Sequence, residues 1–561
     1  MTWRAFLITQ RQGSAMSPDS ADRATARAVW SDFCAVSPSP ELRDRLRSDL
    51  QRIRETNTGL AAHIAPARTP RRPGFDDGTI IPPEEFPAGT PAARIRAAAA
   101  ERAPLRGTVR VIVVLVDFPD KELTATAQHF RDLFFSENTL EHGSVRDYFK
   151  EVTHGLVSIS GEVVGPVTLP HTLAWYANNN FGIGRPSGEA RANIMARDAA
   201  IQADPSINYA PYDNDGNGFV DAFVLVHAGE GGEVTGEPGD LWSHKWTLPK
   251  PYPSDGAKIY GYLTIPEDAK IGVCAHELGH LLFGFPDLYD IDGTSEGVGD
   301  WCLMSGGSWG GGGDIPVHPS AWCKAQQQWV STQRVTTDGT LALPDVKNGF
   351  EVHQLWKRGA PGREYFLLEN RQQTGYDRSL PAPGLLIWHV DENQPDNSDE
   401  NHYKVGLVQA DGCRALEQGG NRGDEGDPYP GSTGNTAFTN GSDPSSHSYA
   451  GAETGVSITG VSAPGEVMTA HVSLAPSPTE RMTTERMTAE RMTAAAGTGA
   501  RAETTPELAG EILEIQARLA AMEQDLASIA SKVLTPLVHT GMQSDAAQMT
   551  AAHGNGRPIP Q

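Results

Sequence analysis

Cysteine is scarce in this chain of 561 residues, which contains five cysteines at wide spacings. So few thiols do not build the disulfide framework of a small secreted domain, and no CxxC pair offers a thiolate zinc site. Cys302 and Cys323 remain a candidate disulfide pair. The fold must therefore depend on a hydrophobic core, and 39% hydrophobic residues in a chain of this length suffice for two to four domains.

Long hydrophobic runs are missing as well. The longest strongly apolar run, Val111 to Val116, is far shorter than the roughly 20 residues that span a bilayer. We therefore expect no transmembrane segment. The first ten residues contain one basic residue and an apolar patch too short for the core of a signal peptide, so no clear export signal is visible.

Positive charge is in the minority, with 46 Lys and Arg against 70 Asp and Glu and a formal net charge of −24. Such a chain repels phosphate backbones and anionic membrane surfaces, so we expect no nucleic-acid partner. The acidity also suits a protein that works outside cells and binds hard cations.

Changes in sequence texture predict a leader and two folded domains. Residues 1–105 are rich in Arg, Ala and Pro and form an N-terminal leader, with one helix expected near Pro40 to Thr56. A continuous β-branched run begins at Thr108, as in a strand covered on both faces. Strands mixed with helices predict an α/β (α+β) domain over 106–335, and short strands with turns predict a β-rich domain over 336–475.

The C-terminal part reads differently. Residues 476–505 repeat a Glu-Arg-Met-Thr unit and form a low-complexity linker, and 536–561 form a disordered tail. Between them, 506–535 are predicted to form a coiled-coil-like helix, because apolar residues over 508–533 recur in steps of four and three. The heptads predict either a homo-oligomer or a single amphipathic helix docked on the protein body.

The motif that indicates chemistry is HELGH, from His276 to His280. On a helix the two histidines project from one face, one turn apart, as two zinc ligands do. Zinc with three protein ligands keeps an open position for water and lowers the pKa of that water towards about 7. Glu277 lies beside the first ligand, where it can act as general base. The alternative, a surface helix with two unengaged histidines, fits the apolar flanking residues poorly.

The segments HELGHLLFGFPDLYD, starting at His276, and GVGDWCLMSGGSW, starting at Gly297, resemble the immune inhibitor A family of secreted bacterial zinc metallopeptidases. The resemblance implies a metzincin-like catalytic domain, an endopeptidase activity on proteins or peptides and an extracellular location. It also implies a third zinc ligand in a Gly-x-x-Asp element, matched by Gly284 and Asp287, and a methionine turn beneath the metal, matched by Met304.

The third ligand departs from the metzincin-type spacing, because Asp287 lies seven residues after His280, where six would be usual. A carboxylate is an acceptable zinc ligand, so Asp287 is the favoured candidate. The competing carboxylates are those of Asp290, Asp292 and Glu296. The alternative to a metal-binding role is that Asp287 only caps the turn that follows Pro286.

The resemblance extends over about residues 108–474. It also makes residues 1–105 a candidate propeptide, since members of this family typically carry a restraining N-terminal extension. Zinc accepts sulfur readily, so a thiolate from Cys34 could occupy the open zinc position. The alternative is an ordinary buried cysteine.

An acidic loop predicts a calcium site. Its oxygen ligands at loop positions one, three, five and nine are Asp213, Asp215, Asn217 and Asp221. Position twelve is Val224, so the loop is no EF-hand, and a plain Asx-rich turn is the alternative. A second acidic cluster, Asp424, Glu425 and Asp427, either binds a cation or is simply solvated.

The sequence thus predicts a zinc endopeptidase in which Glu277 activates water, with Tyr289 as a guess for the donor that assists the metal. His227, His244 and His389 are expected to be hydrogen-bonded structural residues, although His244 could line a substrate cleft. The rival hypothesis is a catalytically silent relative that acts as a cell-surface or extracellular binding protein.

Overall fold

The computed structural model describes residues 34–56, 80–91, 94–95, 102–184, 189–291 and 293–474. The chain divides into two units, residues 1–477 and residues 478–561. All the described residues belong to the first unit. The predicted linker 476–505, the heptad helix 506–535 and the tail 536–561 lie outside the described residues, so these predictions stay untested. No helix within the described ranges is long and apolar enough to cross a membrane.

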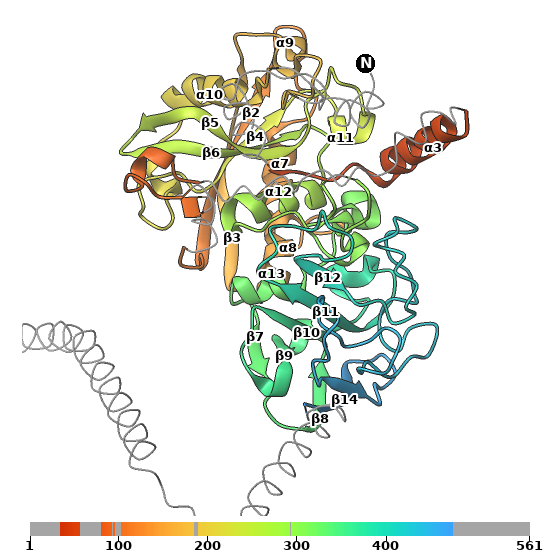
Figure 1. The fold of residues 1–561 in the computed structure, drawn as a ribbon. Helices are drawn as coiled ribbons and strands as arrows, with labels where there is room; N and C mark the ends of the chain where they lie inside the picture. Colours follow the sequence, from red (N-terminus) through yellow and green to blue (C-terminus); the bar gives the residue numbers. More distant parts are fainter. Residues whose placement is uncertain are drawn as a thin grey trace, which may run out of the picture. The chain divides into compact units, whose positions relative to one another are not determined.

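A six-stranded sheet forms the core of the N-terminal half (Figure 1). Its strands, in spatial order, are β1 (Cys34–Ala35), β5 (His244–Ser254), β6 (Ala257–Pro266), β4 (Phe223–His227), β2 (Gly107–Asp117) and β3 (Val157–Thr168). The four strands from β6 to β3 are parallel, whereas β5 is antiparallel to β6 and β1 is antiparallel to β5. The two-residue β1 therefore covers what would otherwise be an antiparallel edge strand.

The predicted buried strand near Thr108 is confirmed, because β2 carries six consecutive fully buried residues from Val111 to Val116. Helices on both faces of the sheet account for this burial, with α10 packed on one face and α12 on the other (Figure 1). The predicted helix at Pro40–Thr56 is also confirmed.

The helices are short, and several start at side-chain caps. A capping box between Ser144 and Asp147 starts α8, for example. The α-helices are α3 (Pro40–Thr56), α7 (Ala127–Phe135), α8 (Val145–Val152), α9 (Leu173–Ala177), α10 (Ala192–Ala203), α11 (Gly232–Thr235), α12 (Ile271–Phe283), α13 (Ala321–Gln326) and α14 (Val346–Gly349). The 3-10 turns are η1 (Pro83–Glu85), η2 (Asp204–Ser206), η3 (Ala210–Tyr212), η4 (Gly299–Trp301), η5 (Gly306–Gly313), η6 (Lys357–Gly359) and η7 (Gly375–Ser379).

The C-terminal half of the described chain is β-rich, as predicted. One sheet contains β12 (Val405–Leu407), β11 (Gly384–Asp391), β10 (Glu364–Arg371), β9 (Glu351–Leu355) and β7 (Ser331–Arg334). A second contains β13 (Ser457–Thr459), β14 (Val467–Ser473) and β8 (Gly339–Pro344). The expected α/β (α+β) domain followed by a β-rich region is therefore confirmed, while the boundary between 335 and 336 remains a prediction.

Buried charges join the β-rich region to the segment after α12. Arg371 of β10 donates from Nε to Asp377 Oδ2 at 2.7 Å, and its Nη1 lies 3.2 Å from Glu369 Oε1. Asp377 also accepts the backbone N–H of His318 at 2.9 Å. Burial alone would raise the pKa of Asp377, but Arg371 holds it far below its ordinary value. The carboxylate is thus ionised, paired and fully buried.

Replacement of Asp377 by Ala should destabilise the protein by about 3–5 kcal/mol, because Arg371 would be left as an uncompensated buried charge. Urea unfolding followed by tryptophan fluorescence measures this loss. Asp314→Ala is the matched control. It removes a surface ion pair with Lys270 and should cost less than about 1 kcal/mol. Equal losses in the two variants would contradict the proposed strength of the buried pair.

Candidate active site

Helix α12 carries the HELGH motif through the interior, and all of its residues are buried. The helix ends at Gly284, whose φ of +65° lies in the left-handed region that favours glycine. The N–H of Gly284 donates to His280 O, and that of Phe285 donates to Gly279 O. This turn reverses the chain, so that the residues after Gly284 return to the histidine face of α12.

Backbone carbonyls orient both histidines. His276 Nδ1 lies 2.9 Å from Leu303 O, and His280 Nδ1 lies 2.6 Å from Phe285 O. A carbonyl can only accept, so each Nδ1 carries the proton and each Nε2 presents a lone pair. Burial lowers the pKa of His280, which favours its neutral ring. Both imidazoles are thereby prepared as Nε2 ligands.

Asp287 completes a convergence of acceptor atoms. Its Oδ1 lies 3.2 Å from Nε2 of both histidines, and the two Nε2 atoms are 3.0 Å apart. Neither carboxylate oxygen of Asp287 has a hydrogen-bond partner among the described residues. Tetrahedral zinc with ligand bonds of about 2.0–2.1 Å would separate its ligand atoms by about 3.3 Å. The three side chains therefore fit a zinc ion, whose charge would satisfy three lone pairs that otherwise repel.

The competing carboxylates have other partners. Asp290 Oδ2 accepts hydrogen bonds from Thr294 and Ser295, and Glu296 forms ion pairs with Arg43 and Arg47. Asp292 lies outside the described residues. The structure thus brings Asp287, and neither Asp290 nor Glu296, to the two histidines.

Glu277 is fully buried beside these ligands. Its Oε1 accepts the backbone N–H of Val36 at 3.0 Å, and its Oε2 has no hydrogen-bond partner among the described residues. Burial, reinforced by the carboxylate of Asp287, raises the pKa of Glu277 well above its ordinary value. One carboxylate oxygen is therefore available to a group placed next to the metal ligands.

Met304 packs beneath the helix between the two histidines. A Cβ built on Gly279 would lie 2.8 Å from Met304 Sδ, so only glycine allows this close approach. Leu303, next to it, supplies the carbonyl that orients His276. Cys302 Sγ accepts the N–H groups of Met304 and Ser320, and both Cys302 and Cys323 are reduced in this structure. The candidate disulfide between them is not formed.

Comparison with known proteins agrees with this geometry. Residues 100–336 match the sequence profile described as immune inhibitor A peptidase M6, catalytic domain. Pre-pro-metalloprotease PrtV of Vibrio cholerae serotype O1 is 31% identical over 306 residues, which covers 44% of this chain and 33% of that protein. Immune inhibitor A of Bacillus thuringiensis subsp. alesti is 33% identical over 221 residues, which covers 33% of this chain and 32% of that protein.

Residues 100–336 are therefore similar in sequence to the catalytic domain of the immune inhibitor A peptidases. The match confirms the predicted resemblance to this family and the mixed α/β fold that it implies for this part of the chain. The match spans about a third of the length of each curated relative.

Three side chains of this domain donate to the N-terminal segment; sequence reasoning named Tyr289 only as a guess for a donor, and it missed the donor roles of Trp242 and Trp309. Trp242 Nε1 donates to Val36 O at 2.9 Å, Tyr289 OH donates to Ala35 O at 2.6 Å, and Trp309 Nε1 donates to Ser37 O at 3.0 Å. Tryptophans close to the motif were the available signal. Their donor role could not be predicted, because it depends on a segment more than 200 residues away in the sequence.

The three histidines expected to be structural are hydrogen-bonded. His244 contacts Trp242 O and Tyr262 OH, His227 contacts Ala228 O, and His389 contacts Glu364. Burial lowers the pKa of His227 and of His244 to about 4, so both rings are neutral. His244 also pairs with Ala35 across two strands, at the edge of the candidate active site.

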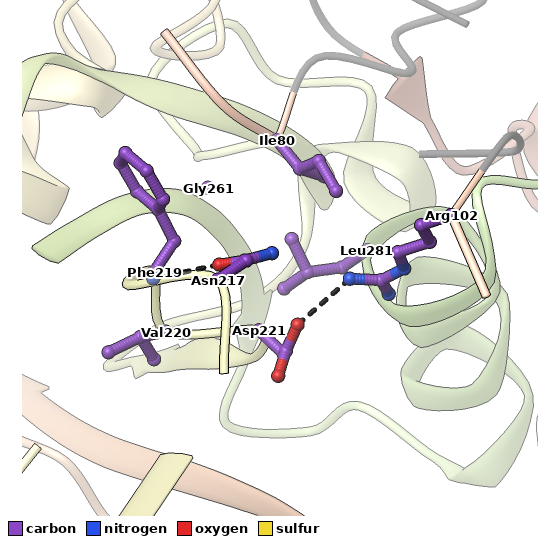
Figure 2. Close-up of a pocket in the computed structure, with 8 residues that line it drawn as sticks. All are labelled: Ile80, Arg102, Asn217, Phe219, Val220, Asp221, Gly261 and Leu281. Carbon is purple, nitrogen blue, oxygen red and sulfur yellow. Dashed lines mark hydrogen bonds and ion pairs between the residues drawn. The ribbon is translucent and has the colours of Figure 1, made fainter. Parts of the chain in front are cut away.

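The predicted calcium loop brings together carboxylate oxygens of Asp213, Asp215 and Asp221 within 4.8 Å of one another. Arg102 occupies the same region, with Nη1 at 2.8 Å from Asp221 Oδ1 (Figure 2). The same nitrogen lies 3.8 Å from Asp215 Oδ2. Asn217 Oδ1 accepts the N–H of Phe219. A neighbouring cavity of about 10 Å³ holds at most one water molecule.

The second acidic cluster differs from its predicted membership. Asp411 joins Asp424 and Asp427 within 4.8 Å, whereas Glu425 is exposed and takes no part. Asp427 accepts a hydrogen bond from Trp301 Nε1 at 2.9 Å. Burial raises the pKa of Asp427 to about 7.

Replacement of Gly279 by Ala should destabilise the protein by about 1–3 kcal/mol, because the added methyl overpacks against Met304. It should also weaken metal binding, because a displaced Met304 would shift the neighbouring Leu303, whose carbonyl orients His276. Thermal unfolding and competition with a metal chelator measure the two effects. Gly239→Ala is the matched control, because nothing lies within 4 Å of its Cβ position. An unaltered Gly279→Ala variant would contradict the packing argument.

Proposed function

We propose that this chain is a zinc-dependent endopeptidase that hydrolyses peptide bonds in proteins. The observation that carries the proposal is the convergence of His276 Nε2, His280 Nε2 and Asp287 Oδ1 within 3.2 Å of one another. Such a set of three protein ligands is typical of a catalytic zinc site, which keeps a further position open.

In the proposed mechanism, zinc supplies Lewis-acid chemistry when bound: it polarises a substrate carbonyl and lowers the pKa of water. Glu277 takes the proton of the attacking water and delivers it to the departing amine. Its second carboxylate oxygen already holds a peptide N–H, that of Val36, so it can reach the nitrogen of a substrate peptide bond. Tyr289 donates to the carbonyl oxygen, as it does to Ala35 O.

Protein substrates would bind in extended form along β5. This antiparallel strand offers backbone groups to a peptide, and β1 already uses them at Lys245 and His244. An extracellular location is proposed from the family resemblance and the acidic composition. We also keep the division into a catalytic domain over 106–335 and a β-rich domain over 336–475, and self-association through residues 508–533, as proposals.

Replacement of Glu277 by Gln should lower cleavage of unfolded casein by about 100- to 10,000-fold, the usual contribution of a general base. Full-length protein is assayed before and after limited trypsin treatment that is then quenched. The variant should retain about one zinc per chain by elemental analysis. The matched control is Glu122→Gln, a change at an exposed glutamate that should leave cleavage unaltered.

Chelation should abolish cleavage by the wild-type protein, and added zinc should restore it. A folded protein that binds no zinc and cleaves nothing would contradict the proposal. In that case the rival, a catalytically silent extracellular binding protein, becomes the better account.

We further propose that calcium binds at Asp213, Asp215, Asn217 and Asp221, in competition with Arg102. A unit charge about 4 Å away is worth about 4 kcal/mol at an effective dielectric constant of 20. The Arg102→Gln variant should therefore bind calcium at least about tenfold more tightly than wild type in calorimetric titration. Arg334→Gln, at an exposed site, is the control. Absence of calcium binding in both proteins would exclude the site.

A further inference from the structure

Residues 34–39 lie across the candidate active site as a peptide substrate would. Cys34 and Ala35 pair antiparallel with Lys245 and His244 of β5. The N–H of Val36 donates to Glu277 Oε1 at 3.0 Å and also lies 3.2 Å from Ser243 O. The general base of the proposed mechanism is therefore engaged by the protein's own backbone.

The peptide bond between Ala35 and Val36 is held on both sides. Tyr289 donates to its carbonyl oxygen, and Glu277 accepts from its nitrogen. Trp242 and Trp309 hold the next two carbonyls. The groups proposed to act on a substrate peptide thus hold this segment instead, and it covers the site.

Cys34 brings a sulfur to the metal ligands. Its side chain is 1% exposed, and its Sγ lies within 4.8 Å of a ring nitrogen of His280 and a carboxylate oxygen of Asp287. The two oxygens of Asp287 are buried and have no hydrogen-bond partner among the described residues, as expected of a carboxylate that binds a cation. Zinc accepts thiolate ligands at about 2.3 Å.

A second set of contacts, outside the substrate-binding strand, anchors this segment. Arg43 of α3 lies 2.8 Å from Glu296 Oε2 and donates to Ser295 O at 2.6 Å, and Arg47 also pairs with Glu296. The side chains of Glu296 and Arg43 are 2% and 12% exposed, so this ion pair is well shielded from water, whereas Arg47 is 34% exposed. Leu42 is buried where a Cβ on Gly236 would meet it at 2.8 Å.

A restraining N-terminal extension is what the family resemblance implies. We infer that in this chain Cys34 is the fourth ligand of the active-site metal, so that a thiolate from residues 34–47 maintains the latent form. The inference rests on the proposed function. With sulfur at the fourth position and Glu277 bound to Val36, neither the position for water nor the base is available. A break in the chain after α3 makes the segment a separate peptide, which loses the high effective concentration of a tethered one and dissociates.

X-ray absorption at the zinc edge tests the ligand directly, without reference to activity. The full-length wild-type protein, loaded with one zinc per chain, should show one sulfur neighbour at about 2.3 Å. The Cys34→Ser variant should lose this sulfur and keep the nitrogen and oxygen neighbours. Cys413→Ser is the matched control, since Cys413 is exposed and outside the site, and it should retain the sulfur signal.

Casein cleavage by the same uncut proteins tests latency. Cys34→Ser should raise basal cleavage by about 100-fold, because one of two linked attachments of the segment is lost. Cys413→Ser should leave it at the wild-type level. Limited proteolysis of wild type should remove the sulfur neighbour and raise cleavage together.

The outcomes separate the inference from the proposed function. Bound zinc without a sulfur neighbour, or a sulfur that persists in Cys34→Ser, would overturn the role of Cys34 and leave the peptidase proposal intact. Unchanged basal cleavage in Cys34→Ser would overturn the proposed role of this thiolate in latency. A wild-type protein that binds no zinc would overturn the proposed function itself.

Discussion

The candidate site depends on the convergence of three buried ligand atoms, two histidine nitrogens and one carboxylate oxygen, whose mutual repulsion a bound cation would relieve. The fold forces them together. Gly284, in the left-handed conformation, ends α12 and reverses the direction of the chain. The carbonyl of Phe285 then orients His280, and Asp287 supplies the carboxylate oxygen next to the two histidine nitrogens. Helix, turn and ligand thus form one continuous unit, and the site is organised before any substrate arrives.

Contacts from distant parts of the chain stabilise this unit. The carbonyl that orients His276 belongs to Leu303, and the N–H of Leu303 donates to His318 O. His318 in turn contacts the buried pair of Arg371 and Asp377. The β-rich region therefore buttresses the histidine face of α12 through hydrogen bonds and ion pairs.

The proposed latency uses the same groups as the proposed catalysis. An antiparallel edge strand, a carboxylate that accepts a peptide N–H and a tyrosine that donates to a carbonyl are what a substrate requires. The N-terminal segment engages each of them, and the ion pairs of α3 hold it there. Inhibition and substrate binding are therefore mutually exclusive by geometry, and no separate conformational switch is required.

The sequence by itself determined the local elements: the buried strand at Val111, the helix at Pro40–Thr56, and the pairing of His276 with His280 on one helical face. These follow from periodicity and spacing over a few residues. The sequence also favoured Asp287 and raised Cys34 as a candidate, but only the tertiary structure places Asp287 beside the two histidines, gives Asp290 and Glu296 other partners, and brings Cys34 close to His280. In the second acidic cluster it places Asp411, instead of Glu425, beside Asp424 and Asp427. Each of these choices joins groups whose distance depends on how turns and sheets fold back, and no local pattern encodes that distance.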